Sequence, residues 1–339
     1  MNTTTKPTRI IRGLLVCLSV ASLAACTKDN LHQDAQQVQV NEGTDALFAT
    51  GALKSAPSQL EQLERYHPIN LDVLARRGRT TTTTTTTNPT TTTPVTGGSS
   101  SSGSTSGSGA PAAYPASFSL DMPVPGTQGG EGSCTAWSTT YGALSFIYKN
   151  ATGAAYSTST NMLSPEYVYN QSKSSTSATD CVSGAILINA LNLLVNQGAC
   201  TWDAMPYSAS NGCSTLPNST QQANAANRKL HGYNLIWASY QGSSSALITN
   251  IKNSIYANKP VVIGMDVYQN FQALGANQVY TGASGSYKGG HSIAICGWDD
   301  NLQAFKVMNS WGTGWATGGF GYISYDAFPS VAWEVYSLY

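Results

Sequence analysis

Charged side chains are scarce in this chain. Asp, Glu, Lys and Arg make up 10% of its 339 residues, and the 17 basic and 17 acidic side chains give a formal net charge of zero. No window of the sequence collects a basic patch, so the composition argues against nucleic acid as a partner. Ser, Thr, Gly and Asn are abundant instead, and this composition is typical of exported proteins.

The chain also lacks the cysteine and histidine patterns of metal sites. Its four histidines form no cluster beside a cysteine, and no two cysteines form a C-x-x-C pair. We therefore expect no bound metal and no cofactor. The seven cysteines are Cys17, Cys26, Cys134, Cys181, Cys200, Cys213 and Cys296.

The apolar run near the N-terminus, residues 14–25, is too short to span a bilayer. Lys6, Arg9 and Arg12 precede this run, and a basic stretch before a short apolar stretch is the layout of a secretory signal peptide. The sequence therefore predicts a signal peptide over residues 1–25.

The signal ends in Leu-Ala-Ala-Cys, with the cysteine at position 26. This ending resembles the bacterial lipobox, in which the cysteine is lipidated and becomes the first residue of the mature chain. The resemblance implies a lipid anchor at Cys26 that holds the protein at the cell envelope, on the outer membrane or the cell surface. The alternative is ordinary cleavage after a small residue, with Cys26 incidental.

A change of composition divides the rest of the chain into three parts. Residues 79–110 are rich in Thr, Ser and Gly and cannot bury apolar surface, so they are predicted to be a linker. Residues 26–78 contain a short helical period and a basic cluster, and they read as a spacer by default, with a pro-segment or a partner-binding peptide as alternatives. Residues 111–339 are long enough for one domain with a real core.

This domain reads as helices followed by strands. Ser164 and Pro165 fit the N-cap and first position of one helix, residues 185–197 have a helical period that Gly198 ends, and a third helix is predicted near residues 245–256. Apolar segments after position 260 read as strands. We therefore expect an α+β fold of two lobes. The predicted strands are the segments PVVIGMDV, HSIAICGW, AFKVMN, GFGYISY and WEVYSLY.

Cys134 stands where a glycine-rich turn meets a segment of helical period. A helix N-terminus stabilises an anion on its first turn, so this position is expected to lower the pKa of the thiol and favour the nucleophilic thiolate. His291 opens a predicted strand, and Asn309 follows it by 18 residues. A cysteine, a base and a residue that orients the base therefore occur in this order along the chain.

Four motifs of the sequence resemble those of the papain-like cysteine proteases. Gly-Ser-Cys ends at Cys134, Gln128 stands six residues before it, GGHSIAICGW contains His291, and NSWGTGW begins at Asn309. The resemblance covers about residues 115–339. It implies a helical lobe and an antiparallel, barrel-like β lobe with the active-site cleft between them, and a monomeric cysteine-type endopeptidase acting on peptides or proteins.

The resemblance also implies roles for single residues. Cys134 attacks the peptide carbonyl, His291 takes the thiol proton, and Asn309 orients the imidazole ring. Gln128 stabilises the oxyanion together with the backbone N–H of Cys134. Trp311 covers the contact between the histidine and the asparagine.

The sequence departs from the family pattern at several positions. Glu131 replaces the cysteine that normally braces the loop before the nucleophile, and Thr135 replaces the aromatic residue after it. Gly184 matches the glycine that offers its backbone to an extended substrate, but Ser183 replaces the glycine before it. Two other functions stay open: a catalytically silent relative that only binds, and a peptidoglycan-cutting cysteine amidase.

The remaining cysteines pose a pairing problem. A helix of about 20 Å separates Cys181 from Cys200, which is too far for a disulfide. Cys200 and Cys213 flank a short segment rich in turn residues, so we predict a disulfide between them, with Cys181–Cys213 as the alternative pairing. Because Cys296 alternates with isoleucines on a predicted strand, we expect it to be a buried free thiol.

Overall fold

The computed structural model describes residues 48–66, 114–208, 212–242 and 245–339. All of these residues fall within one compact unit, Val38–Tyr339. The predicted signal peptide, Cys26 and the predicted linker lie outside the described residues. None of the described helices has both the length and the apolar character needed to cross a membrane.

The first half of the domain is helical, as the sequence predicts. The helix that begins at Cys134 runs without a break through three segments, of which the middle one has the wider π-helical turn. Ser164 accepts a hydrogen bond from the backbone N–H of Tyr167 (3.3 Å) and so caps the next helix. These elements are α3 (Cys134–Ala136), η2 (Trp137–Leu144), α4 (Ser145–Thr152), α5 (Pro165–Ser172), α6 (Leu187–Asn196), η3 (Trp202–Ala204), η4 (Gly212–Ser214) and α7 (Ser219–Ala225).

The second half of the domain forms most of an eight-stranded sheet, to which the start of the domain adds strand β2. Its main path runs β4-β10-β5-β7-β8-β9-β6, β2 pairs with β7, and neighbouring strands are antiparallel except for β6 and β9. All five predicted strands are present. The strands are β2 (Ser117–Ser119), β4 (Tyr233–Ala238), β5 (Val261–Tyr268), β6 (Val279–Tyr280), β7 (Tyr287–Asp299), β8 (Ala304–Met308), β9 (Phe320–Ser324) and β10 (Ala332–Leu338), and the helices of this half include α8 (Leu247–Tyr256), α9 (Gln269–Gln272) and α10 (Phe328–Val331).

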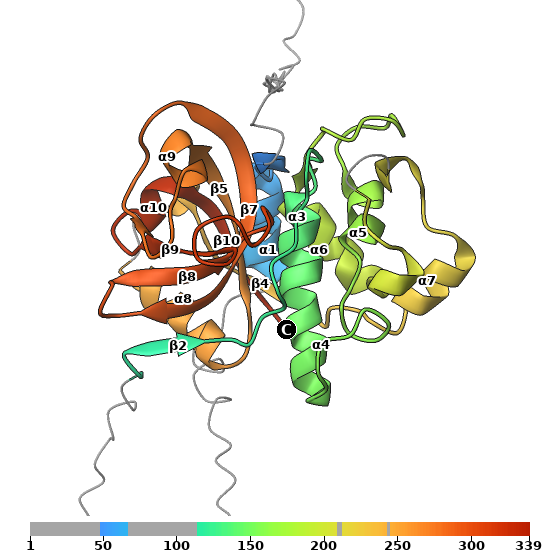
Figure 1. Cartoon of the computed structure of the whole chain (residues 1–339), viewed down its shortest axis with the longest axis horizontal. Helices are drawn as coiled ribbons and strands as arrows, with labels where there is room; N and C mark the ends of the chain where they lie inside the picture. The colour runs from blue at the N-terminus through green and yellow to red at the C-terminus, as the bar shows by residue number, and fades with distance from the viewer. Residues whose placement is uncertain (1–47, 67–113, 209–211, 243–244) are drawn as a thin grey trace, which may run out of the picture. The chain divides into compact units, whose positions relative to one another are not determined.

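Strand β7 joins the two halves of the domain. It pairs with β5 on one side and with β8 on the other, and it packs against α3 and η2 (Figure 1). His291 on β7 is buried and lies opposite Met265 of β5. The first turn of the long helix and the start of the longest strand therefore meet in the core, and the predicted α+β fold is confirmed.

The disulfide prediction is wrong in its pairing. Cys213 is bonded to Cys181, with 5.5 Å between their Cα atoms, whereas Cys200 and Cys296 are buried free thiols. The backbone carbonyl of Cys200 accepts from Ser164 N–H (2.9 Å), which fixes this residue beside the start of α5. The loop that follows α5 folds back toward η4, so the alternative pairing is the observed one.

Residues 48–66 carry regular structure, where the sequence favoured a spacer. Strand β1 (Ala52–Leu53) pairs in parallel with β3 (Ala185–Ile186). Helix α1 (Pro57–Tyr66) packs against β4, and Leu60 on this helix is 3% exposed. We call residues 48–56 the covering segment, because they lie over the residues described next.

Candidate active site

Cys134 begins helix α3 and is completely buried. Backbone hydrogen bonds from Ser292, Thr135 and Ala52 favour its thiolate, but burial outweighs them and raises the pKa of the thiol to about 12. The expected lowering of this pKa is therefore wrong for the covered state of the protein. The helix terminus is where the sequence predicts it, but desolvation by the surrounding residues is the larger effect.

The hydrogen bonds of Asn309 fix the protonation of His291. Asn309 Oδ1 accepts from the backbone N–H of Ser310 (2.8 Å) and lies 2.8 Å from His291 Nε2. An oxygen can only accept, so Nε2 carries the hydrogen and Nδ1 has a free lone pair. Nδ1 is buried and has no hydrogen-bond partner among the described residues, so it is available to take a proton from a thiol.

Trp311 covers this histidine. Its ring stacks on the imidazole with 4.5 Å between centroids and 24° between planes, and only 5% of Trp311 is exposed. Burial lowers the pKa of His291 to about 4, although its hydrogen bond with Asn309 acts in the opposite direction. Cysteine and histidine are therefore both neutral in the covered state, and an ion pair between them is not favoured.

Gln128 is held at three points. Its backbone N–H donates to Ser310 O (2.8 Å), its Oε1 accepts from Ser310 Oγ (2.6 Å), and its Nε2 donates to Glu131 O (2.7 Å). An amide nitrogen carries two hydrogens, so one N–H of Nε2 remains for a substrate oxygen. Ser310 is a residue of the site that the sequence pattern does not predict, although it stands beside Asn309 in the motif that carries the resemblance.

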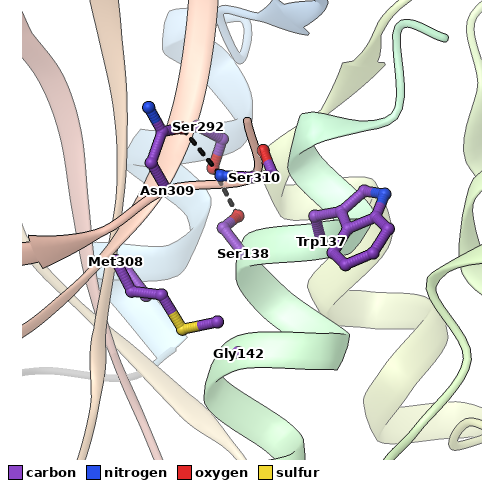
Figure 2. Close-up of a pocket in the computed structure, with 8 residues that line it drawn as sticks. Trp137, Ser138, Gly142, Ser292, Met308, Asn309 and Ser310 are labelled. Carbon is purple, nitrogen blue, oxygen red and sulfur yellow. Dashed lines mark hydrogen bonds between the residues drawn. The ribbon is translucent and has the colours of Figure 1, made fainter. Parts of the chain in front are cut away.

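A hydrogen bond between two serine hydroxyls joins the long helix to strand β7. Figure 2 shows Ser138 of η2 and Ser292 of β7 pointing toward each other, and their hydroxyl groups are 2.6 Å apart. Trp137, Met308 and Asn309 also line the small cavity beside them, whose volume is about 10 Å³. This space holds at most about one water molecule, so the helix and the strand are closely packed here.

The covering segment crosses the site from β7 to β3. The N–H of Gly51 donates to Gly290 O (2.7 Å), and Gly51 O accepts from Ala185 N–H (2.9 Å). Farther back along the segment, Trp311 Nε1 donates to Ala49 O (2.9 Å). The backbone N–H of Ala52 lies at the thiol of Cys134. The peptide bond between Gly51 and Ala52 therefore lies next to the Cys134 thiol.

Glycines on both walls make room for this segment. A Cβ atom added to Gly184 would lie 1.6 Å from Gly51 O, and one added to Gly290 would lie 2.2 Å from Ala52 O. A Cβ on Gly51 would lie 2.5 Å from Gly132 O. Gly184, predicted to hold substrate, thus lies directly against a peptide of the chain itself.

A buried carboxylate fastens the end of the covering segment. Glu334 on β10 is 2% exposed and accepts from the N–H of Ser55 (2.6 Å) and from its hydroxyl (2.7 Å). The hydroxyl of Tyr336 donates to the same carboxylate (2.8 Å). These bonds to a charged acceptor are the stronger kind, and they fix the segment on the β lobe.

Solved structures share this fold. Xylellain, a cysteine protease from Xylella fastidiosa, matches 67% of this chain and 87% of its own with 21% identity and a TM-score of 0.55. The bromelain protease from Ananas comosus, in complex with the E64 inhibitor, matches 66% of this chain and 99% of its own with 19% identity and a TM-score of 0.51.

Sequence relatives and a family model also match this chain to cysteine proteases. A gut-specific cysteine proteinase of Caenorhabditis elegans is 40% identical over 73 residues, 21% of this chain and 22% of its own length. Cathepsin B-like cysteine proteinase 3 of that organism is 29% identical over 117 residues, 34% of this chain and 30% of its own length. The chain thus spans less than a third of these two relatives. The model of the papain family of cysteine proteases matches residues 124–334, and the chain belongs to that family.

Proposed function

We propose that this chain is a cysteine endopeptidase that is held inactive by its own covering segment. The observation that supports the activity best is the free lone pair on His291 Nδ1, which the hydrogen bond between Nε2 and Asn309 leaves in place. A ring fixed in this tautomer is a general base for Cys134. Gln128 and the first N–H groups of α3 supply hydrogen-bond donors beside it.

The reaction follows from these positions. His291 Nδ1 takes the proton of Cys134 Sγ, and the thiolate attacks the carbonyl carbon of a peptide bond. The negative oxygen accepts hydrogen bonds from Gln128 Nε2 and from the Cys134 backbone N–H. The proton passes from His291 to the leaving amine, and water, activated by the same imidazole, hydrolyses the thioester. Gly184 and Trp311 border the peptide, as the resemblance implies.

The two other candidate functions explain fewer contacts. A silent binding protein would not need Asn309 to fix the tautomer of His291 or Ser310 to hold the amide of Gln128. A peptidoglycan amidase with a cysteine and histidine pair would share only those two residues with this site. A peptidase uses all of these groups.

The covering segment supports latency. The carbonyl oxygen of Gly51 accepts a hydrogen bond from Ala185 N–H, and it makes none with Gln128 Nε2, which donates to Glu131 O. Attack on this carbonyl would leave its oxyanion without the donors of Gln128, so the segment occupies the site without being cut. It also excludes water, which disfavours the charged forms of Cys134 and His291.

An affinity label tests the peptidase function. We expect an epoxysuccinyl probe to form a covalent bond with Cys134, located by mass spectrometry of peptides, in the purified chain that carries Gly51→Leu, because a leucine at position 51 has no space beside Gly132 and opens the site. In this opened chain, Cys134→Ala should carry no label, and Cys296→Ala, which removes another buried thiol, should be labelled like its parent. A label on a different cysteine, or one that persists in Cys134→Ala, would show that the nucleophile is wrongly assigned.

We also propose that a lipid anchor at Cys26 displays the enzyme on the cell envelope. The support is the lipobox-like ending of the apolar run. We expect Cys26→Ser to move the protein from the membrane fraction to the soluble fraction, or to leave the signal uncleaved. Cys17→Ser, inside the same apolar run, is the control and should stay with the membrane. Unchanged fractionation of Cys26→Ser would refute the anchor.

A further inference from the structure

Glu131 is a buried acid that the catalytic steps do not use. It lies three residues before Cys134 and is completely buried. Neither of its carboxyl oxygens has a hydrogen-bond partner among the described residues. Glu166 of α5 is also buried, with one such oxygen unpartnered, while the other accepts from Ser208 N–H (3.2 Å). Glu131 and Glu166 are therefore two buried acids that together have three carboxyl oxygens without a hydrogen-bond partner among the described residues.

No group around Glu131 forms an ion pair with it among the described residues. The ammonium group of Lys173 donates to three backbone oxygens, at 3.0 to 3.1 Å. The hydroxyl of Tyr207 donates to Gln128 O (2.8 Å) and pairs with Ser133 Oγ (2.6 Å). The groups that face Glu131 are Glu166 and Tyr169 of α5, Lys173 directly after it, Tyr207, and the disulfide Cys181–Cys213.

An ionised carboxylate in these surroundings is costly, because it has neither water nor a paired charge. Protonation removes the cost. Burial, and then the charge of Glu166, raise the pKa of Glu131 to about 7. Tyr207, the backbone of Cys213 and the charge of Lys173 act in the opposite direction but are smaller effects. The side chain therefore changes charge near neutral pH, at a position where it is excluded from solvent and has no ion pair among the described residues.

The backbone of Glu131 is part of the catalytic loop. Its carbonyl accepts from Gln128 Nε2 (2.7 Å), which orients the amide toward the site. The next residue, Gly132, donates its N–H to Cys181 O (2.9 Å) and is packed against the backbone of Ser183. A displacement of Glu131 would therefore shift the oxyanion donor and the nucleophile together.

We propose that Glu131 is a positioning residue that keeps Gln128 and Cys134 in place only while its side chain is uncharged, so that the site loosens when this carboxyl ionises. The inference rests on the proposed function for its effect on catalysis. Its effect on stability stands on the burial alone.

The sign of the stability effect follows from linkage. A carboxyl group whose pKa is higher in the folded chain binds its proton more tightly there than in the unfolded chain. Its contribution to stability is complete below about pH 4.5, the ordinary value, and is lost as the pH rises through about 7. In Glu131→Gln, which is uncharged at every pH and similar in shape, this loss is absent.

The test uses the full chain and two readouts. Melting temperature is measured from pH 5 to pH 8 for the wild type, Glu131→Gln and the exposed control Asp326→Asn. We expect the wild type and Asp326→Asn to fall together toward pH 8, and Glu131→Gln to fall less. The second readout is kcat in chains that also carry Gly51→Leu, which opens the site. It should decline above pH 7 without a matching change of KM, and Glu131→Gln should remove the decline.

Glu166→Gln gives an independent check, and it serves if Glu131→Gln fails to fold. It removes one cause of the high pKa of Glu131, so the decline of kcat should begin at lower pH. The proposal would be overturned if the wild type and the variants had the same pH dependence of both the melting temperature and kcat. A difference in melting temperature alone would overturn the positioning role. If the opened chain cuts no peptide, the proposed function fails, and alkylation of Cys134 by iodoacetamide replaces kcat as the readout.

Discussion

Gly51→Leu is expected to raise the peptidase activity of the full chain by about 10- to 10²-fold. A Cβ at position 51 would lie 2.5 to 2.7 Å from the backbone of Gly132, and the larger leucine side chain has no space there. Forcing extra atoms into a filled site typically costs about 1–3 kcal/mol, and each 1.4 kcal/mol changes an equilibrium about tenfold. The strain raises the free energy of the covered state, in which the segment lies over Cys134, but not that of the open state, in which the segment has left the site. The population of the open state therefore increases.

The measurement is the initial rate at which the wild type and the variant, at equal protein concentration, hydrolyse a fluorogenic peptide. Lys54→Ala is the matched control: it lies in the same segment, its side chain is largely exposed, and it removes a 3.5 Å contact with Asp266 and a cation–π contact with Trp333 at 5.2 Å. It should change the rate little. Equal rates for Gly51→Leu and wild type, with the variant folded, would mean that the segment does not control access to Cys134.

His291→Ala, made in the Gly51→Leu chain, is expected to lower kcat by about 10²–10⁴-fold, the usual contribution of a positioned general base. The substitution removes the group that takes the thiol proton but leaves the substrate walls intact, so KM should change little. His231→Ala is the control, because His231 is exposed and takes no part in the site. A loss of kcat as large in His231→Ala, or none in His291→Ala, would remove this imidazole from the mechanism.

Local signals in the sequence predict the helices and strands well. Ser164 and Pro165 mark the start of α5 because the cap and the first helical position depend on neighbouring residues only. The motifs around Cys134, His291 and Asn309 are also local signals: Cys134 begins α3, His291 lies within β7 and Asn309 directly follows β8. Family resemblance supplies the rest of the site, apart from Ser310.

Other features depend on contacts between distant residues. Strand β1 has two residues and forms because β3 offers it a partner. No periodic pattern of apolar residues in residues 26–78 therefore predicts it. The pairing of Cys213 with Cys181 depends on how a loop folds back, which spacing does not reveal. The pKa of Cys134 rises because a segment about 80 residues earlier in the chain helps to bury it, an effect that outweighs the local helix terminus.

The order of the parts along the chain gives the covering segment a second consequence. Residues 48–56 lie between Cys26 and the domain, so with the proposed anchor the inhibitor stays on the membrane side of any cut in residues 67–113. Before such a cut the tether keeps the segment at a high effective concentration near the site. After it, only non-covalent contacts hold the domain to its own anchored inhibitor. Activation and departure from the cell surface would then be one dissociation step, and a neighbouring intact chain would have no free segment with which to recapture the enzyme.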